Sequence, residues 1–216
     1  MKQISILSLA IIFSLSINSY AQNSKLEFGI KAGGNYSKFT PNFEVDGREY
    51  GVYQRKAGFY LGGFLSKRIS EKFYFQPELH FVHRQTDFLI QGVEITGHEV
   101  GGIVLDLETN ITESVIAVPL MLRYHFTRSF FVDAGPQAGF IIDRNEKLQN
   151  DPLEQPGNPE VITEYDYDKF DVGLNLGTGY DLTEDLTING RYFFGIVERD
   201  NSIKSSVFSL GLEYKL

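Results

Sequence analysis

Residues 113–143 constrain the fold more than any other part of the chain, because they contain two long alternating segments joined only by Thr127, Arg128 and Ser129. Alternation with a period of two predicts β-strands with one apolar and one more polar face. Both arms exceed the roughly 5 to 6 residues of an average strand, which favours a wall tall enough to cross a membrane. The apolar parity carries Ile116, Val118, Leu120, Leu122, Tyr124 and Phe126 opposite Arg123 and His125, then Phe130, Val132, Ala134, Ala138, Phe140 and Ile142 opposite Asp133, Gln137 and Asp143.

Six further segments show the same alternation, so the sequence predicts eight strands. Their connections alternate between long and short, with long ones at 40–56, 88–112 and 144–168. This pattern is typical of a bacterial barrel with short periplasmic turns and long extracellular loops. The predicted fold is all-β, an eight-stranded antiparallel up-and-down transmembrane β-barrel whose closure removes exposed strand edges. A soluble lipocalin-like barrel is the alternative. The six segments are 26–39, 57–68, 73–87, 169–182, 186–198 and 204–216.

The amino terminus has the plan of a secretory signal peptide. Lys2 precedes an apolar stretch from Ile4 to Ile17, and the small residues Ser19 and Ala21 follow. The stretch is shorter than the ~20 residues that a spanning helix needs. We therefore expect residues 1–21 to be a cleaved signal peptide and residues 22–216 to be one outer-membrane barrel domain, exported to the bacterial outer membrane. The net charge of −8 makes nucleic acid an unfavourable partner.

The polar parity of the strands supplies a set of charged residues for the barrel lumen. An eight-stranded barrel is narrow, so these charges are expected to pair with one another as a structural plug. We single out Glu78, Arg123, Asp133 and Arg191 as a lumen charge cluster. A narrow path for ions, with Glu78 and Arg123 or Arg191 as its gate, is the functional alternative. The full set is Glu27, Lys31, Glu78, His80, Arg84, Arg123, His125, Asp133, Asp171, Arg191 and Glu213.

Three prolines, Pro77, Pro119 and Pro136, fall inside predicted strands. Each removes a backbone donor from the ladder, and a closed barrel has no edge strand to absorb the loss. We therefore expect bulges or locally broken pairing at these positions.

The sequence offers little support for catalysis or metal binding, and we predict no enzyme activity, no cofactor and no metal site. His80 and His83 are three residues apart, which places them on opposite faces of a strand. His83 with Asp87 is the one arrangement near the outer leaflet that fits a lipid-modifying enzyme, but no serine motif flanks it. The acidic loop 144–168 lacks the spacing of a calcium-binding EF-hand, so a solvated loop is expected, with calcium as the alternative.

The segments FQPELHFVHR, IAVPLMLRYHF, FFVDAGPQAGFII, FDVGLNLGTGYDL and LTINGRYFFGI, in this order, resemble the strand motifs of the outer-membrane beta-barrel (PorT-like) proteins of Bacteroidetes-type bacteria. The resemblance implies an eight-stranded barrel similar in architecture to OmpA- and OmpX-type proteins. The chain departs from many such barrels by ending in Leu216, with Tyr214 two residues earlier, instead of a terminal aromatic residue.

The fold and the resemblance together predict a monomeric, non-enzymatic envelope protein. Its partners are expected to be outer-membrane lipid and an extracellular or envelope protein bound through the loops, in a structural, adhesive or partner-binding role. The alternatives are a channel for ions or very small solutes, a lipid-modifying enzyme, and an accessory barrel of a secretion system. A fold alone does not choose among these roles.

Overall fold

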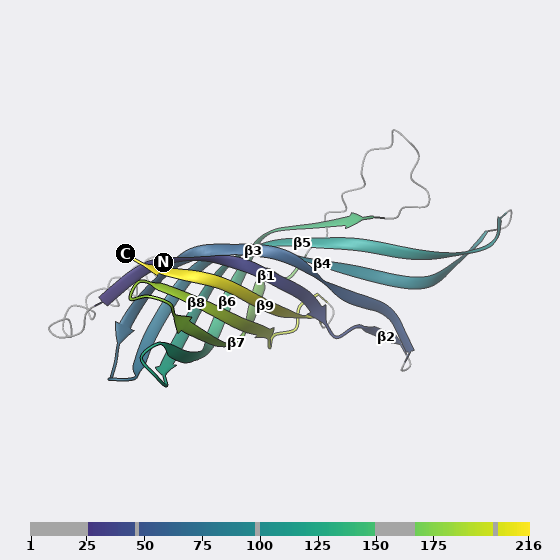
Figure 1. The fold of residues 1–216 in the computed structure, drawn as a ribbon. Helices are drawn as coiled ribbons and strands as arrows, with labels where there is room; N and C mark the ends of the chain where they lie inside the picture. The colour runs from purple at the N-terminus through teal and green to yellow at the C-terminus, as the bar shows by residue number, and fades with distance from the viewer. Residues whose placement is uncertain (1–25, 46–47, 98–99, 150–166, 201–202) are drawn as a thin grey trace, which may run out of the picture.

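The computed structural model describes residues 26–45, 48–97, 100–149, 167–200 and 203–216. The predicted signal peptide at 1–21 and residues 150–166 of the acidic loop lie outside these ranges. All nine elements within the described ranges are strands, and none of the described residues forms a helix that is long and apolar enough to span a membrane. The strands are β1 (Leu26–Thr40), β2 (Phe43–Val45), β3 (Arg48–Arg68), β4 (Phe73–Gly97), β5 (Val100–His125), β6 (Phe130–Leu148), β7 (Phe170–Asp181), β8 (Leu186–Gly195) and β9 (Lys204–Lys215) (Figure 1).

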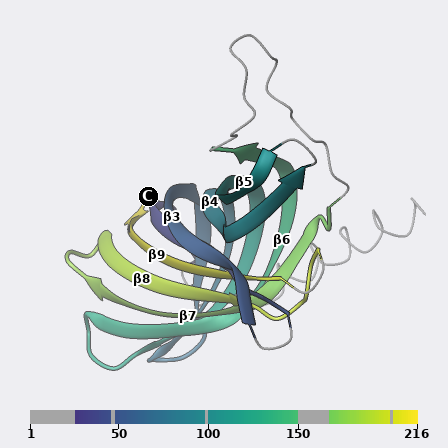
Figure 2. The same cartoon turned by 90° about the vertical axis from the view of Figure 1, so that its right-hand side faces the viewer.

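The strands form one antiparallel sheet that closes on itself. Neighbours in the sheet follow the chain from β3 to β9, and β1 pairs with both β9 and β3. Eight long strands thus make the barrel, while the three-residue β2 pairs only with β3. The predicted fold class is confirmed. Leu26, Lys215 and the short turns 69–72, 126–129 and 182–185 lie at one end, which we call the periplasmic end (Figures 1 and 2).

Beyond the opposite rim, the sheet continues as a projection made of β2 to β6. The prediction of long loops at 40–56 and 88–112 was wrong. β3 already begins at Arg48, and β4 pairs with β5 as far as Gly97 and Val100. In contrast, β1 ends at Thr40 and β7 begins only at Phe170, so these strands do not extend. The result is a long curved sheet that leaves the barrel on one side (Figure 1).

The two faces of the wall differ as the alternation predicts. Large apolar side chains on the outward parity are exposed, as expected for residues of a barrel wall that face lipid. Tyr60 and Phe64, on the opposite parity of β3 from the exposed Leu61, are buried in the lumen. The outward residues include Leu26, Phe28, Ile30, Leu61, Leu79, Leu122, Phe140, Leu176, Phe208, Leu210 and Leu212.

Two lumen aromatics lie directly against glycines of other strands. The Tyr60 hydroxyl occupies the place where a side chain at Gly211 would begin, and the Phe131 ring does the same at Gly179. An added methyl group at either glycine would clash with the ring. These glycines let large rings fill a lumen that is too narrow to hold side chains on every strand.

All three prolines coincide with broken pairing to the preceding strand. Pairing of β3 with β4 skips Pro77, pairing of β4 with β5 skips Pro119, and pairing of β5 with β6 skips Pro136, with the register unchanged across each gap. On its other side, each proline remains in register with the following strand. The bulge in this region lies elsewhere, between Ser114 and Val115, where β6 contains one extra residue.

Candidate functional site in the charged lumen

Arg191 on β8 is the centre of an ion-pair cluster in the periplasmic half of the lumen. Its guanidinium lies 2.7 Å from Glu78 on β4 through Nη1 and 2.7 Å from Asp133 on β6 through Nη2. All three side chains are buried. Because both acidic partners are charged, the guanidinium fork is used for two hydrogen-bonded ion pairs at once.

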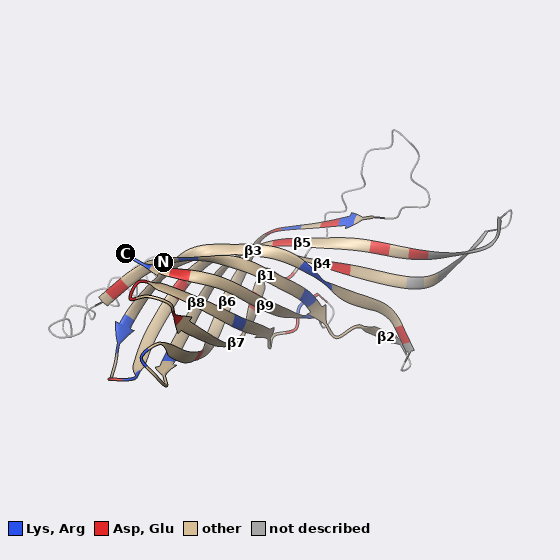
Figure 3. Cartoon of the chain, in the orientation of Figure 1, with Lys and Arg blue, Asp and Glu red and all other residues tan. Residues whose placement is uncertain are grey.

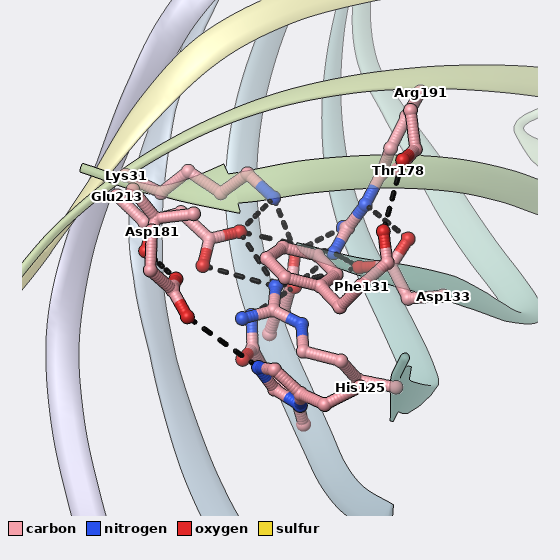
Figure 4. Close-up of polar contacts among 12 residues, drawn as sticks. Lys31, His125, Phe131, Asp133, Thr178, Asp181, Arg191 and Glu213 are labelled. Atoms are coloured by element: carbon pink, nitrogen blue, oxygen red, sulfur yellow. Dashed lines mark hydrogen bonds and ion pairs between the residues drawn. The ribbon is translucent and has the colours of Figure 1, made fainter. Parts of the chain in front are cut away.

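Three more residues close this cluster into a ring. Arg123 on β5 lies 3.4 Å from Asp133 and 3.0 Å from Glu213 on β9. Lys31 on β1 then lies 2.8 Å from Glu213 and 3.6 Å from Glu78. We call these six residues the ion-pair ring: Glu78, Arg191, Asp133, Arg123, Glu213 and Lys31, in order around the ring (Figure 4).

The ring is electrically balanced, because its three cations alternate with its three carboxylates. Each member comes from a different strand, and each has a partner on both sides. Burying an unpaired charge is very costly, whereas a complete ring compensates every charge in it. The Arg123 guanidinium also lies 3.7 Å from the centroid of the Phe131 ring, which covers one of its faces. The ring therefore fills this level of the lumen.

A second cluster, the outer network, surrounds Glu113 in the extracellular half. Glu113 on β5 lies 2.6 Å from Arg84 on β4, 3.2 Å from Arg199 and 3.6 Å from Arg144 on β6. Arg84 also lies 2.7 Å from Asp171 on β7. Arg199 differs from the others because it comes from the connection between β8 and β9, yet its side chain is fully buried.

Asp200, the next residue of this connection, links it to β6 and to the residues before β7. Its carboxylate pairs with Arg144 and accepts a hydrogen bond of 2.7 Å from the backbone N–H of Asp168. Ser205 donates a hydrogen bond of 2.7 Å to Asp171, and Arg199 donates one of 3.3 Å to Ser205. Arg199 and Asp200 are therefore held at the extracellular end of the lumen, and the Arg199 side chain points inward to Glu113.

A small cavity of about 50 Å³ lies between the two clusters. Arg191 of the ion-pair ring and Arg84 of the outer network both line it, as do Asn35, Tyr60 and His80. The Oδ1 atom of Asn35 and the hydroxyl of Tyr60 are buried, and neither has a hydrogen-bond partner among the described residues. At the periplasmic end, a vestibule of about 1020 Å³ opens below the ion-pair ring, with Arg123 at its inner wall.

The structure brings the predicted lumen cluster together, since Glu78, Arg123, Asp133 and Arg191 are four of the six ring members. Lys31 and Glu213 complete the ring, and His80 Nε2 lies 2.9 Å from Glu78. Arg84 and Asp171 belong to the outer network instead.

Two predicted lumen residues lie apart from both clusters. Glu27 is at the periplasmic end, 3.5 Å from Lys215, and His125 lies 3.5 Å from Asp181 in the vestibule. Neither residue takes part in the pairing that fills the barrel.

Sequence reasoning missed Glu113, Arg144 and Arg199. Glu113 shares the parity of Arg123 and was detectable, but the predicted loop 88–112 ended just before it. Arg144 faces Glu113 because the extra residue of the β6 bulge reverses the parity, which also leaves Asp143 exposed rather than on the lumen side. Arg199 lies outside any strand, so no periodicity marked it.

The two residues considered for catalysis, His83 and Asp87, each contact other residues. His83 is on the outer wall with its ring 5.3 Å from the Phe59 ring. Asp87 lies 2.7 Å from Lys56 and accepts a hydrogen bond of 2.7 Å from Asn110. Within the described residues, no three His, Asp or Glu side chains come together in a way that could hold a metal ion.

The fold and the lumen define a closed antiparallel barrel with an apolar outer wall and an ion-paired interior. The family model described as "Outer membrane protein beta-barrel domain" matches residues 20–198, so the chain belongs to this family of outer-membrane proteins. No curated protein matches the chain.

Solved structures with a similar fold include three outer-membrane proteins. Neisserial surface protein A is 11% identical with a TM-score of 0.49, covering 88% of this chain and 97% of its own. Ail of Yersinia pestis, solved with the heparin analogue sucrose octasulfate, is 12% identical with a TM-score of 0.45, covering 89% and 99%. OprG of Pseudomonas aeruginosa is 14% identical with a TM-score of 0.45, covering 88% and 95%.

Proposed function

We propose that the protein is a monomeric, non-enzymatic barrel that anchors the projecting β2–β6 sheet at the cell surface, where this sheet contacts an extracellular or envelope partner. The observation that carries the proposal is the contrast between a lumen filled by paired charges and a sheet that continues past the rim. A filled lumen suits an anchor better than a transport path.

The projecting sheet has features that suit partner binding. After Ile90, β4 pairs only with β5. Before Thr109, β5 pairs only with β4 among the described strands. Such a two-stranded ribbon presents backbone N–H and C=O groups along both edges, and an extended segment of a partner can pair with them. A structural role, an adhesive role, or an accessory role in secretion like that of PorT-like proteins would each use the edges of this ribbon.

A strain that lacks the gene tests this role when complemented with a trimmed chain. Residues 92–105 would be replaced by a two-residue turn, which removes the tip of the ribbon and leaves the barrel strands intact. The trimmed chain should fold, as heat-modifiable gel migration reports, but fail to restore the adhesion or envelope phenotype of the deletion strain. Full restoration by the trimmed chain would contradict the proposal.

A narrow channel is the second candidate, and the cavity and vestibule on either side of the ion-pair ring favour it. Conduction would require the Glu78–Arg191 pair to open, because this pair lies in the lumen between the two spaces. In planar bilayers, the purified chain should give no steady current if the lumen is an anchor. Steady single-channel currents, altered in size by Glu78→Gln, would favour the channel instead.

A further inference from the structure

Basic side chains gather on the outer wall at the extracellular ends of β1, β3 and β9. Lys38 on β1 is in register with Ser206 on β9, and the next outward pair is Thr40 with Lys204. Arg55 on β3 reaches across β1 to the same place, where its guanidinium donates a hydrogen bond of 2.8 Å to the Ser206 hydroxyl. We call Lys38, Arg55 and Lys204, with the neighbouring Tyr36 and Tyr192, the basic rim patch.

The patch belongs to the lipid-facing side of the wall. Lys38 and Tyr36 share the parity of Phe28 and Ile30, which are exposed apolar residues of the same strand. Tyr192 is also exposed, and its hydroxyl lies 2.6 Å from the Ser206 hydroxyl. The patch is therefore the first polar level above the apolar belt, at the depth where lipid headgroups meet the barrel and where tyrosines are enriched.

The cations of the patch are poorly compensated by the protein itself. Arg55 donates hydrogen bonds to the Ser206 hydroxyl and to the backbone carbonyls of Tyr36 and Ser206, and it forms no ion pair with a carboxylate in the described part of the chain. Lys204 lies 3.2 Å from Glu198, and both of these side chains are exposed.

Lys38 makes no ion pair with any described residue, and the carboxylate of Asp87 on the neighbouring wall is already paired with Lys56. The three cations of the basic rim patch thus have a single carboxylate partner, Glu198, among the described residues, although the net charge of the chain is −8. Figure 3 shows that acidic and basic residues are otherwise interspersed along the strands.

We propose that the basic rim patch binds the phosphorylated headgroup of a lipid in the outer leaflet. A guanidinium fork matches the oxygens of a phosphate, and a lysine adds a point charge beside it. The tyrosines provide amphipathic rings at the same depth. The ligand chemistry is a phosphate monoester on a lipid, bound from the side of the barrel. This surface is separate from the projecting sheet, so the failure of either proposal leaves the other intact.

Native mass spectrometry of the detergent-folded full chain tests this inference. The chain would be titrated with bisphosphorylated lipid A, with the dephosphorylated form of the same lipid, and with inorganic phosphate. We expect retention of the phosphorylated lipid only. Each removed cation should weaken retention about fivefold, since a basic residue near an anionic lipid surface contributes about 1 kcal/mol. Lys38→Gln and the double variant Lys38→Gln, Arg55→Gln should therefore lose about 5-fold and about 25-fold.

Lys67→Gln is the matched control, because Lys67 points outward from β3 at the periplasmic end, in register with the exposed Leu26 and Phe75. It should retain lipid as the unchanged chain does. Equal retention of both lipid forms, equal loss in the control, or inorganic phosphate binding as tightly as the lipid would each overturn the inference. Should Arg55→Gln fail to fold, Lys38→Gln alone decides the question, since Lys38 forms no ion pair between strands within the described residues.

Discussion

The ion-pair ring and the outer network occupy the same lumen but are built in different ways. Every member of the ring is on a strand, and its three cations and three carboxylates alternate around a closed circuit. The outer network converges on Glu113 and depends on Arg199, which a connection between strands supplies. The ring is therefore part of the wall, whereas the outer network also holds a loop in place over the opening.

This difference shows how one barrel can separate the stability of its wall from the closure of its extracellular end. A ring held by six hydrogen-bonded strands cannot rearrange without disturbing the whole sheet. The outer network retains the Arg84–Glu113 contact of 2.6 Å even if the connection with Arg199 moves away. We therefore expect stability to depend mainly on the ring and the closure of the extracellular end to depend on Arg199.

The largest effect is expected for Arg191→Met. The change leaves Glu78 and Asp133 buried without their shortest ion pair: Glu78 keeps Lys31 at 3.6 Å and His80 at 2.9 Å, and Asp133 keeps Arg123 at 3.4 Å. Breaking a buried pair by removing one partner costs about 3–5 kcal/mol, so the free energy of unfolding should fall by that amount. Urea unfolding from lipid vesicles measures it. Arg128→Met, in an exposed turn, is the control and should change little.

A smaller loss is expected for Arg199→Gln. Glu113 keeps Arg84 and Arg144, so no carboxylate is left unpaired, and the loss should be about 1–3 kcal/mol. The same unfolding measurement applies, together with proteolysis of the intact protein to detect release of the connection between β8 and β9. A loss as large as that of Arg191→Met would show that the two clusters do not differ as described.

The double variant Arg191→Met, Arg199→Gln tests whether the clusters are independent. Arg191 and Arg199 share no ion-pair partner, and the 50 Å³ cavity lies between their clusters. Substitutions at separate sites without shared partners add to within about 0.5 kcal/mol. A coupling energy well above that value would mean that the lumen behaves as one network.

The smallest effect is expected for the chain trimmed at residues 92–105. The removed ribbon pairs only with itself, and shortening a loop slightly lowers its closure entropy cost. The free energy of unfolding should stay within about 1 kcal/mol of the unchanged chain. A large loss in the vesicle assay would make the projection a part of the barrel core.

The sequence was sufficient to predict the barrel and most of the ion-pair ring, because period-two alternation places every other residue of a regular strand inside. Lys31, Arg123, Asp133, Arg191 and Glu213 all follow from this rule. The rule fails where a strand is irregular. One extra residue in β6 turned Arg144 inward and Asp143 outward, and no local feature of the sequence marks that bulge.

The projecting sheet was not predicted, for a related reason. Residues 88–112 contain alternating apolar residues, but glycines at 92, 97, 101 and 102 and scattered acids resemble a loop. The backbone register pairs Ile95 with Ile103 and Val93 with Leu105. The paired segments are consecutive in the chain, but register shifts between Ile90 and Val93 and between Ile95 and Gly97 interrupt the period-two pattern that would have marked them as strands.

The fit of the Tyr60 hydroxyl against Gly211 bears on how the wall reaches its final alignment. If β9 slid by two residues, keeping its apolar side toward lipid, Ser209 or Glu213 would stand where Gly211 now stands, and either would collide with the phenol. The contact between the Tyr60 ring and Gly211 therefore selects the native register of β9. In a shifted register this clash opposes closure of the barrel, so the register can still change before the last strands pair.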